Sequence, residues 1–124
     1  MQVALNRVIL LGDLTRNPEL RETNGGTTVC MFGLVMDRYY TSNGENRVET
    51  TFLDITTYGR TADAVARYTH KGSTVLVEGR LHLDQWETRD NPPQKRSKLI
   101  VIGETVKFVS GGDTEVPAEK SGRW

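Results

Sequence analysis

Residues 71–86, KGSTVLVEGRLHLDQW, decide how the rest of the chain is arranged. From Val75 onward apolar and other side chains alternate, with Leu76 as the one exception, and this period of two predicts one long half-buried strand. Twelve residues at roughly 3.3 Å each would span about 40 Å, which is too long for a flat strand in a small domain. Gly79 is therefore predicted to be the point where the strand bends to wrap a barrel or leaves it as an arm.

Trp86 ends this strand on the face of Arg80 and His82 and not on the face of the valines. A large aromatic ring among charged side chains contributes little to a core, but it offers a surface on which a ligand can stack. We therefore predict that Trp86 belongs to a binding site. The alternative is a ring that folds back onto the core.

Length and composition predict a single domain. The chain has 124 residues, 36% of them hydrophobic, so we expect one domain over 1–110 and a short disordered tail over 111–124. The net charge is zero, with 14 Lys/Arg against 13 Asp/Glu in the domain, so a positive surface requires local clustering. Cys30 is the only cysteine, which excludes an intramolecular disulfide and is typical of a reducing compartment. Without a signal-peptide pattern or a membrane-length apolar run, the sequence predicts a soluble intracellular protein.

Further strands and one helix follow from the pattern of apolar and turn-forming residues. Their expected bounds are strands over 3–14, 19–21, 27–38, 47–58 and 99–109, and a helix over 61–71. Asn43 and Gly44 are a strong hairpin signal within a loop over 39–46. The polar, proline-interrupted segment 87–98 is expected to be a mobile loop. Its basic cluster is Lys95, Arg96 and Lys98.

The helix is expected to have Thr61 as its N-cap and Gly72 as the glycine just past its C-terminus. A stripe of small residues runs along one face, at Ala62, Val65, Ala66 and Thr69. This stripe allows the helix to pack closely against the end of a barrel.

Two of the strands are apolar on both faces, at 8–11 and at 29–36. Such a strand has to be covered twice, by the barrel interior and by something outside it. In a chain this small, the outer cover is expected to be another subunit. The pattern thus favours an oligomer.

The element order β-β-β-α-β-β predicts an all-β OB-fold, a five-stranded Greek-key barrel with one α-helix between strands 3 and 4. In this fold, the face of strands 2 and 3 and the neighbouring loops bind oligonucleotides or oligosaccharides. The fold by itself does not decide between these ligands.

Four aromatic rings are predicted to lie off the core. Alternation along 47–58 places Phe52 and Tyr58 on the face opposite the aliphatic side chains, Tyr40 lies in the loop before it, and Trp86 is the fourth ring. Single strands bind by stacking bases on such rings along a positive groove. The basic side chains available beside them are Arg7, Arg21, Arg38, Arg60, Arg80, Arg89, Lys95 and Arg96.

On these motifs the chain resembles the bacterial-type single-stranded DNA-binding protein (SSB) family, over essentially residues 1–109. The matching stretches are NRVILLGDLTRNPELR (6–21), the strand over 25–34, YGRTADAVARYTHKGS (58–73), VEGRL (77–81) and Trp86. The resemblance implies an OB-fold that assembles, usually as a homotetramer, and wraps single-stranded DNA without sequence preference in DNA replication, recombination and repair. It implies a cytoplasmic, nucleoid-associated location, with an organelle as the alternative. By position, the stacking aromatics are Tyr40, Phe52, Tyr58 and Trp86, and the phosphate-contacting residues are Arg7, Arg21, Arg60 and Lys71.

Several positions depart from the family pattern. Tyr40 and Phe52 stand where the best-known members have tryptophan, so stacking should be weaker there. Asp54, Asp84 and Gln85 stand where members often have basic or neutral residues, and an acid near a phosphate path opposes binding.

The C-terminal segment GGDTEVPAEKSGRW also departs from the family, whose long linker ends in an acidic tip with Pro-Phe that recruits partner enzymes. We therefore expect no recruitment of replication or repair proteins through such a tip. The chain is expected to be either a truncated form or a tail-less SSB, such as an organellar, plasmid, phage or secondary copy.

Other chemistries have little support in the sequence. His70 and His82 lack a ligand spacing, and no P-loop, nucleophile elbow or Cys–His pair is present, so we expect no enzyme, metal or cofactor. Two other readings stay open. One is an OB-fold replication adaptor of the primosomal type that acts mainly through protein contacts, and the other is an OB module for structured RNA or oligosaccharide.

Overall fold

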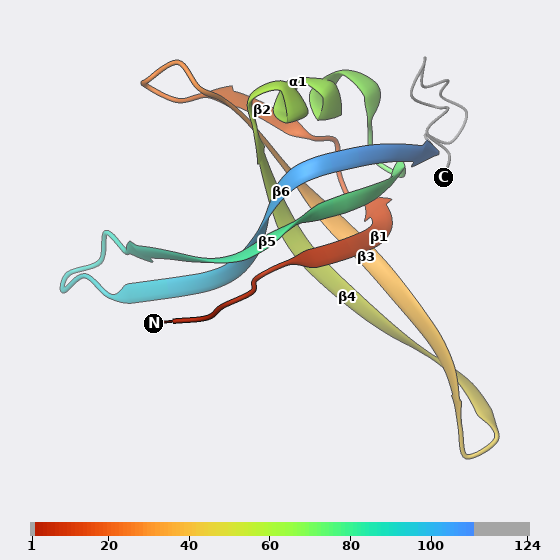
Figure 1. Ribbon diagram of the computed structural model, residues 1–124. Coiled ribbons are helices and arrows are strands. Elements are labelled where there is room, and N and C mark those ends of the chain that lie inside the picture. Colours follow the sequence, from red (N-terminus) through yellow and green to blue (C-terminus); the bar gives the residue numbers. More distant parts are fainter. Residues whose placement is uncertain (1, 111–124) are drawn as a thin grey trace.

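The computed structural model describes residues 2–110, which form six strands and one helix (Figure 1). The elements are β1 (Val8–Leu14), β2 (Glu19–Glu22), β3 (Thr28–Ser42), β4 (Glu45–Tyr58), α1 (Gly59–Tyr68), β5 (Thr74–Glu87) and β6 (Lys95–Ser110). The predicted tail over 111–124 lies outside the described residues.

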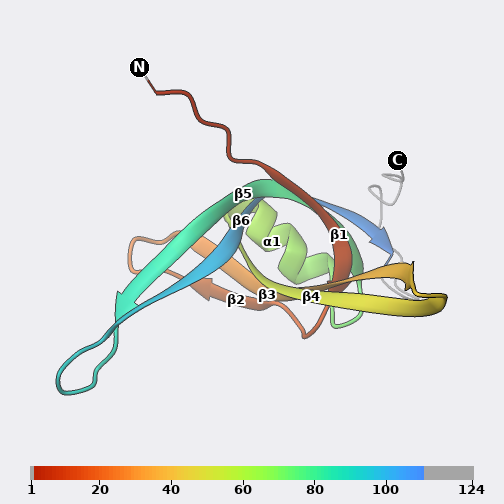
Figure 2. The same cartoon turned by 90° about the horizontal axis from the view of Figure 1, so that it is seen from below.

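Five of the strands close into a barrel. The strand order is β1-β5-β6-β4-β3-β2, and an additional β1–β3 pairing closes the ring while β2 stays attached to β3 alone. β4 and β6 pair in parallel, and the other pairs are antiparallel. Figure 2 looks into this ring and shows α1 lying across its far end. The predicted five-stranded OB-fold, with its helix between the third and fourth barrel strands, is confirmed.

Two long hairpins leave the barrel as arms (Figure 1). In the first, here called the β3–β4 arm, pairing continues without a register shift up to Ser42 and Glu45. Asn43 and Gly44, with φ values of 52° and 78°, form the predicted turn. The expected loop over 39–46 was therefore too long, because a two-residue turn of this kind keeps both strands in register to the tip.

The second arm, the β5–β6 arm, pairs as far as Glu87 and Lys95. The basic residues Lys95, Arg96 and Lys98 thus lie on strand β6, and not in a mobile loop as predicted. Polar residues extend the ladder here because an exposed ribbon can display them on both faces.

Gly79 is the bend that the sequence predicts. The β5–β6 register shifts between Glu78 and Gly79, and a Cβ atom at position 79 would lie 1.9 Å from the carbonyl oxygen of Ile102. Before Gly79 the alternate residues of β5 are buried, whereas Leu81 and Leu83 beyond it are exposed. The glycine thus marks the point where β5 leaves the barrel.

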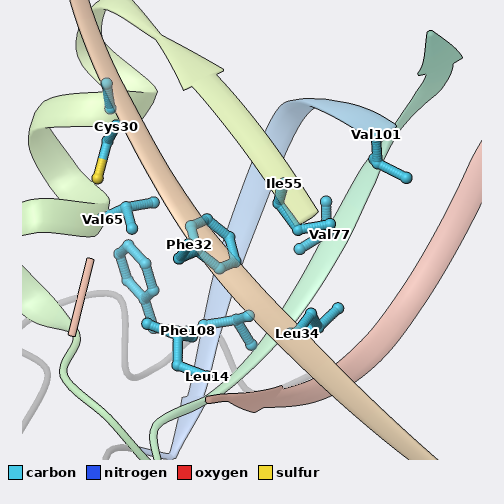
Figure 3. Packing of buried hydrophobic residues seen from close by; sticks show 11 residues of the cluster. Leu14, Cys30, Phe32, Leu34, Ile55, Val65, Val77, Val101 and Phe108 are labelled. Carbon is cyan, nitrogen blue, oxygen red and sulfur yellow. The ribbon is translucent and has the colours of Figure 1, made fainter. Parts of the chain in front are cut away.

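The core fills the barrel and extends to the helix (Figure 3). Four side chains of strands β3, β4 and β5 have no exposed surface, namely Phe32, Leu34, Ile55 and Val77. Val65 of α1 packs into the same cluster. Burial of such side chains supplies the main stabilising contribution of a small domain.

The helix begins two residues earlier and ends three residues earlier than predicted. Gly59, with a φ of 63°, turns the chain from β4 directly into α1, so Tyr58 is the N-cap residue and no side chain caps the helix. The hydroxyl of Thr61 donates instead to the carbonyl of Glu104, 3.3 Å away. The helix ends at Tyr68, with Thr69 as its C-cap residue. Gly72 belongs to the following turn and donates its N–H to the carbonyl of Leu14.

Strand β1 starts five residues later than predicted, at Val8 instead of position 3. The side chain of Asn6 accepts a hydrogen bond from the N–H of Leu81 at 2.8 Å and donates one to its carbonyl at 2.9 Å. This amide replaces the backbone pairing that would have continued the β1–β5 ladder.

We expect Cys30 to resist thiol reagents in the folded protein. Its side chain has no exposed surface, and burial, followed by the negative charge of Glu19, raises its pKa to about 11. Because the thiolate is the reactive form, labelling with Ellman's reagent near neutral pH should require unfolding. The free energy of unfolding should also fall as pH rises from about 9 to about 11, because the unfolded thiol ionises first. Rapid labelling of the native protein would contradict this burial.

Candidate nucleic-acid interface

Phe52 and Tyr58 lie on the outer face of β4, as the alternation predicts. Their side chains are 67% and 47% exposed, whereas Ile55 between them is fully buried. Tyr58 pairs with Val29 of β3, which in turn pairs with Arg21 of β2. Directly paired residues project to the same side of a sheet, so Arg21 and Tyr58 share one face.

Tyr39 and Tyr40 lie on strand β3 near the tip of its arm, on opposite faces. The register is continuous, so Tyr39 shares the face of Phe52, and Tyr40 projects to the other side. Tyr39 is 77% exposed, whereas Tyr40 is 37% exposed and has the guanidinium of Arg38 at 4.7 Å from its ring centre. Both residues contribute atoms to the lining of an open hollow of about 510 Å³. The sequence pattern missed Tyr39 because faces cannot be assigned within an expected loop.

Trp86 lies on the β5–β6 arm, opposite Arg96, and is half-exposed. The alternative of a ring folded back onto the core is therefore wrong. A second open hollow, of about 390 Å³, lies beside this ring. It is lined by Gln85, Trp86, Glu87, Lys95, Arg96 and Ser97. Each arm thus combines an aromatic ring with basic side chains.

Several of the predicted basic residues are already paired with carboxylates. The guanidinium of Arg7 lies 3.8 Å from the carboxylate of Glu78 and 3.7 Å from that of Glu104. Arg80 lies 3.5 Å from the same Glu104. These pairs form one cluster on strands β5 and β6 and the segment before β1. Pairs this exposed contribute little stability and leave the arginines exchangeable.

On β2 and β3, Arg21 pairs with Glu19, and Arg38 pairs with Glu49 at 3.0 Å. The other predicted basic residues have no carboxylate within ion-pair distance in the part of the chain from 2 to 110. They are Arg60 on α1, Lys71 after it, and Arg89, Lys95 and Arg96 on the β5–β6 arm. The candidate interface therefore contains both cations that pair with a carboxylate and cations that do not.

Within residues 2–110, no group of three or more His, Cys, Asp or Glu side chains is placed to hold a metal ion. In the same residues, no helix is both long and apolar enough to cross a membrane. The described residues therefore offer neither a metal-ion site of this kind nor a membrane-spanning helix beside the surface described above.

The fold and this surface define an OB-fold protein with two exposed arms that carry rings and cations. The sequence model of the Single-strand binding protein family matches residues 5–109, and the chain belongs to this family. The family consists of non-enzymatic binding proteins.

Individual relatives agree with this assignment. The single-stranded DNA-binding protein of Wolinella succinogenes is 39% identical over 105 residues, which cover 84% of this chain and 64% of the relative. That of Thermotoga maritima is 37% identical over 115 residues, covering 92% and 80%. The solved structure of Plasmodium falciparum SSB in complex with ssDNA superposes with a TM-score of 0.78 at 25% identity, covering 89% of this chain and 99% of that one. The chain thus spans about two thirds of the Wolinella protein.

Proposed function

We propose that this protein binds single-stranded DNA without sequence preference and protects it during DNA replication, recombination and repair. The observation that supports this most directly is the set of exposed rings on two separate arms, each beside basic side chains. A similar fold is present in the Plasmodium protein bound to ssDNA. Its place of action would be the nucleoid, in the cytoplasm or in an organelle.

In this proposal, bases stack on Tyr40, Phe52, Tyr58 and Trp86. Phosphates follow the basic residues of the interface, with the unpaired cations engaged first. These phosphate-binding residues are Arg7, Arg21, Arg60, Lys71, Arg80, Arg89, Lys95 and Arg96. Stacking is tolerant of sequence because every base has a flat π-face. Duplex DNA is excluded because paired and stacked bases cannot present those faces to the rings.

The first test is quenching of tryptophan fluorescence by poly-dT, compared with a duplex of equal length. Strong quenching and tight binding by the single strand alone would support the proposal. Affinity should fall with salt at a slope of about −0.7 for each phosphate neutralised. Weak binding to both nucleic acids would instead favour the adaptor that acts through protein contacts. Binding that does not change with salt would favour an oligosaccharide ligand.

Tyr39 is expected to add to the stacking face. Replacing it in Tyr39→Ala should weaken binding to oligo-dT by about 1 kcal/mol or more if its ring stacks a base. Tyr40→Ala, measured beside it, compares the two faces of the same arm. Unchanged affinity in Tyr39→Ala, with a loss in Tyr40→Ala, would restrict the DNA to the other face.

We also propose that the chain assembles through the outer face of β1, with a homotetramer as the expected state. Ile9 and Leu11 on this face are 61% and 55% exposed, although the strand is in the middle of a barrel wall. Leu11→Glu should therefore lower the mass measured by sedimentation equilibrium, because a buried charge at an interface is costly. Glu22→Gln, on an exposed strand, serves as the control. A monomeric wild-type protein at micromolar concentration would contradict the proposed assembly.

A further inference from the structure

Asp54 of β4 connects three segments of the chain through its two carboxylate oxygens. Oδ1 lies 3.7 Å from the guanidinium of Arg16, in the connection between β1 and β2. Oδ2 accepts a hydrogen bond from Nζ of Lys98 on β6. One carboxylate is therefore shared between two cations that come from different parts of the barrel, and the cluster keeps one net positive charge.

This ion-pair cluster lies where the two arms separate. The parallel pairing of β4 with β6 begins at Ile55 and Val101, so Asp54 and Lys98 lie just outside the paired region. From this point β4 runs into one arm and β6 belongs to the other, as Figure 1 shows. We call this cluster of Arg16, Asp54 and Lys98 the fork.

The chain makes room for the fork at Gly33, the cross-strand partner of Asp54. A Cβ atom there would lie 2.3 Å from Oγ1 of Thr15 and 3.0 Å from Nη1 of Arg16. The N–H of Thr15 donates to the carbonyl of Gly33 at 3.0 Å, which holds the β1–β2 connection over the sheet. A larger residue at position 33 would displace the guanidinium from Asp54.

The fork lies next to a ring of the proposed stacking face. Asp54 is two residues from Phe52 and projects from the same face of β4. Both side chains line an open hollow of about 250 Å³. Its lining residues are Phe52, Leu53, Asp54, Lys98 and Leu99. A phosphate next to a base stacked on Phe52 would therefore approach the two cations and the carboxylate between them.

We infer that Asp54 sets the affinity for single-stranded DNA by occupying Arg16 and Lys98, so that phosphates must replace its carboxylate to reach them. This role rests on the proposed function. The side chains at the fork are 37–54% exposed, and ion pairs with this exposure are weak enough to exchange. In the absence of DNA the carboxylate offsets one of the two positive charges while it contacts both cations, which lowers the positive potential at the fork.

Asp54→Asn tests this role directly. The variant should bind oligo-dT more tightly than wild type at about 50 mM salt, because two cations become available to phosphates. Each added phosphate contact should steepen the salt slope by about 0.7, so the gain should shrink roughly threefold per contact between about 50 and about 200 mM salt. A substitution that only perturbed the fold would not steepen this slope. The thermal unfolding midpoint of Asp54→Asn should stay within a few degrees of the wild-type value.

Two further variants separate the fork from general effects of charge. Glu22→Gln removes the same charge from an exposed β2 residue that forms no ion pair within 2–110, and it should leave the slope unchanged. In a Lys98→Gln background, Asp54→Asn should give a smaller gain, because one of the two released cations is missing.

The outcomes distinguish a failure of the role of Asp54 from a failure of the proposed function. If the wild-type protein does not bind oligo-dT, the proposed function and the role of Asp54 both fail. If the wild-type protein binds but Asp54→Asn has the same affinity and salt slope, or changes them no more than Glu22→Gln does, the role of Asp54 alone is overturned. Tighter binding at low salt together with a steeper salt slope, both seen only in Asp54→Asn, would support the role of Asp54.

Discussion

The double variant Phe52→Ala/Trp86→Ala should lose about 2–6 kcal/mol of binding free energy for oligo-dT per subunit, since each stacked base contributes about 1–3 kcal/mol. This corresponds to at least a roughly thirtyfold weaker affinity. The two rings lie on different arms, so their losses should add. Both side chains are exposed, so their removal should leave the melting temperature nearly unchanged. Fluorescence anisotropy of a labelled oligo-dT at fixed salt measures the loss.

The matched control is Phe52→Tyr/Trp86→Phe, which keeps a flat ring at both positions. It should retain most of the affinity, because stacking depends on the ring and not on a particular polar group. If the alanine variant binds as tightly as wild type, the two rings do not form the DNA path. If the aromatic control also loses affinity, contacts other than stacking are made at these positions.

Gly79→Ala is expected to have the largest effect on stability. The added Cβ would lie 1.9 Å from the carbonyl oxygen and 2.9 Å from the carbonyl carbon of Ile102, and backbone atoms cannot move aside by a change of rotamer. Overpacking of this kind costs about 3 kcal/mol. The midpoint of thermal unfolding should fall by roughly 10 °C at equal protein concentration. Because β5 also turns here into its arm, DNA binding should weaken as well.

Gly25→Ala provides the control for this substitution. No heavy atom lies within 4 Å of the position of its Cβ, and its φ lies outside the left-handed region. The change should therefore be neutral or slightly stabilising, through the lower entropy of the unfolded chain. Equal melting temperatures for the Gly79 and Gly25 variants would contradict the close approach of β5 to β6.

Local patterns in the sequence predicted most of the barrel. Alternation placed Phe52 and Tyr58 outside and the aliphatic residues inside, because neighbouring residues of a strand project to opposite faces. Asn43 and Gly44 fixed the first hairpin turn, since both positions require a positive φ. The bend at Gly79 was predicted from the same kind of short-range signal.

Errors arose where tertiary contacts decide the ends of elements. The loops over 39–46 and 87–98 became parts of the two arms, because strand pairing continues wherever the partner strand is available. The helix lost its predicted cap at Thr61, since the chain passes straight from β4 through Gly59 into α1. Composition alone does not contain these constraints.

The sequence by itself determined the order of the strands, the turn at Asn43 and Gly44, the bend at Gly79 and the position of the four rings outside the core. Each of these features depends on residues that are close along the chain. The tertiary structure decided which cations are occupied and which rings share a face. Asp54 and Lys98 are 44 residues apart. The register of β3 with β4 places Tyr39 on the same face as Phe52. Such pairings depend on which distant residues the closed barrel brings together, and a local pattern of side chains does not specify them.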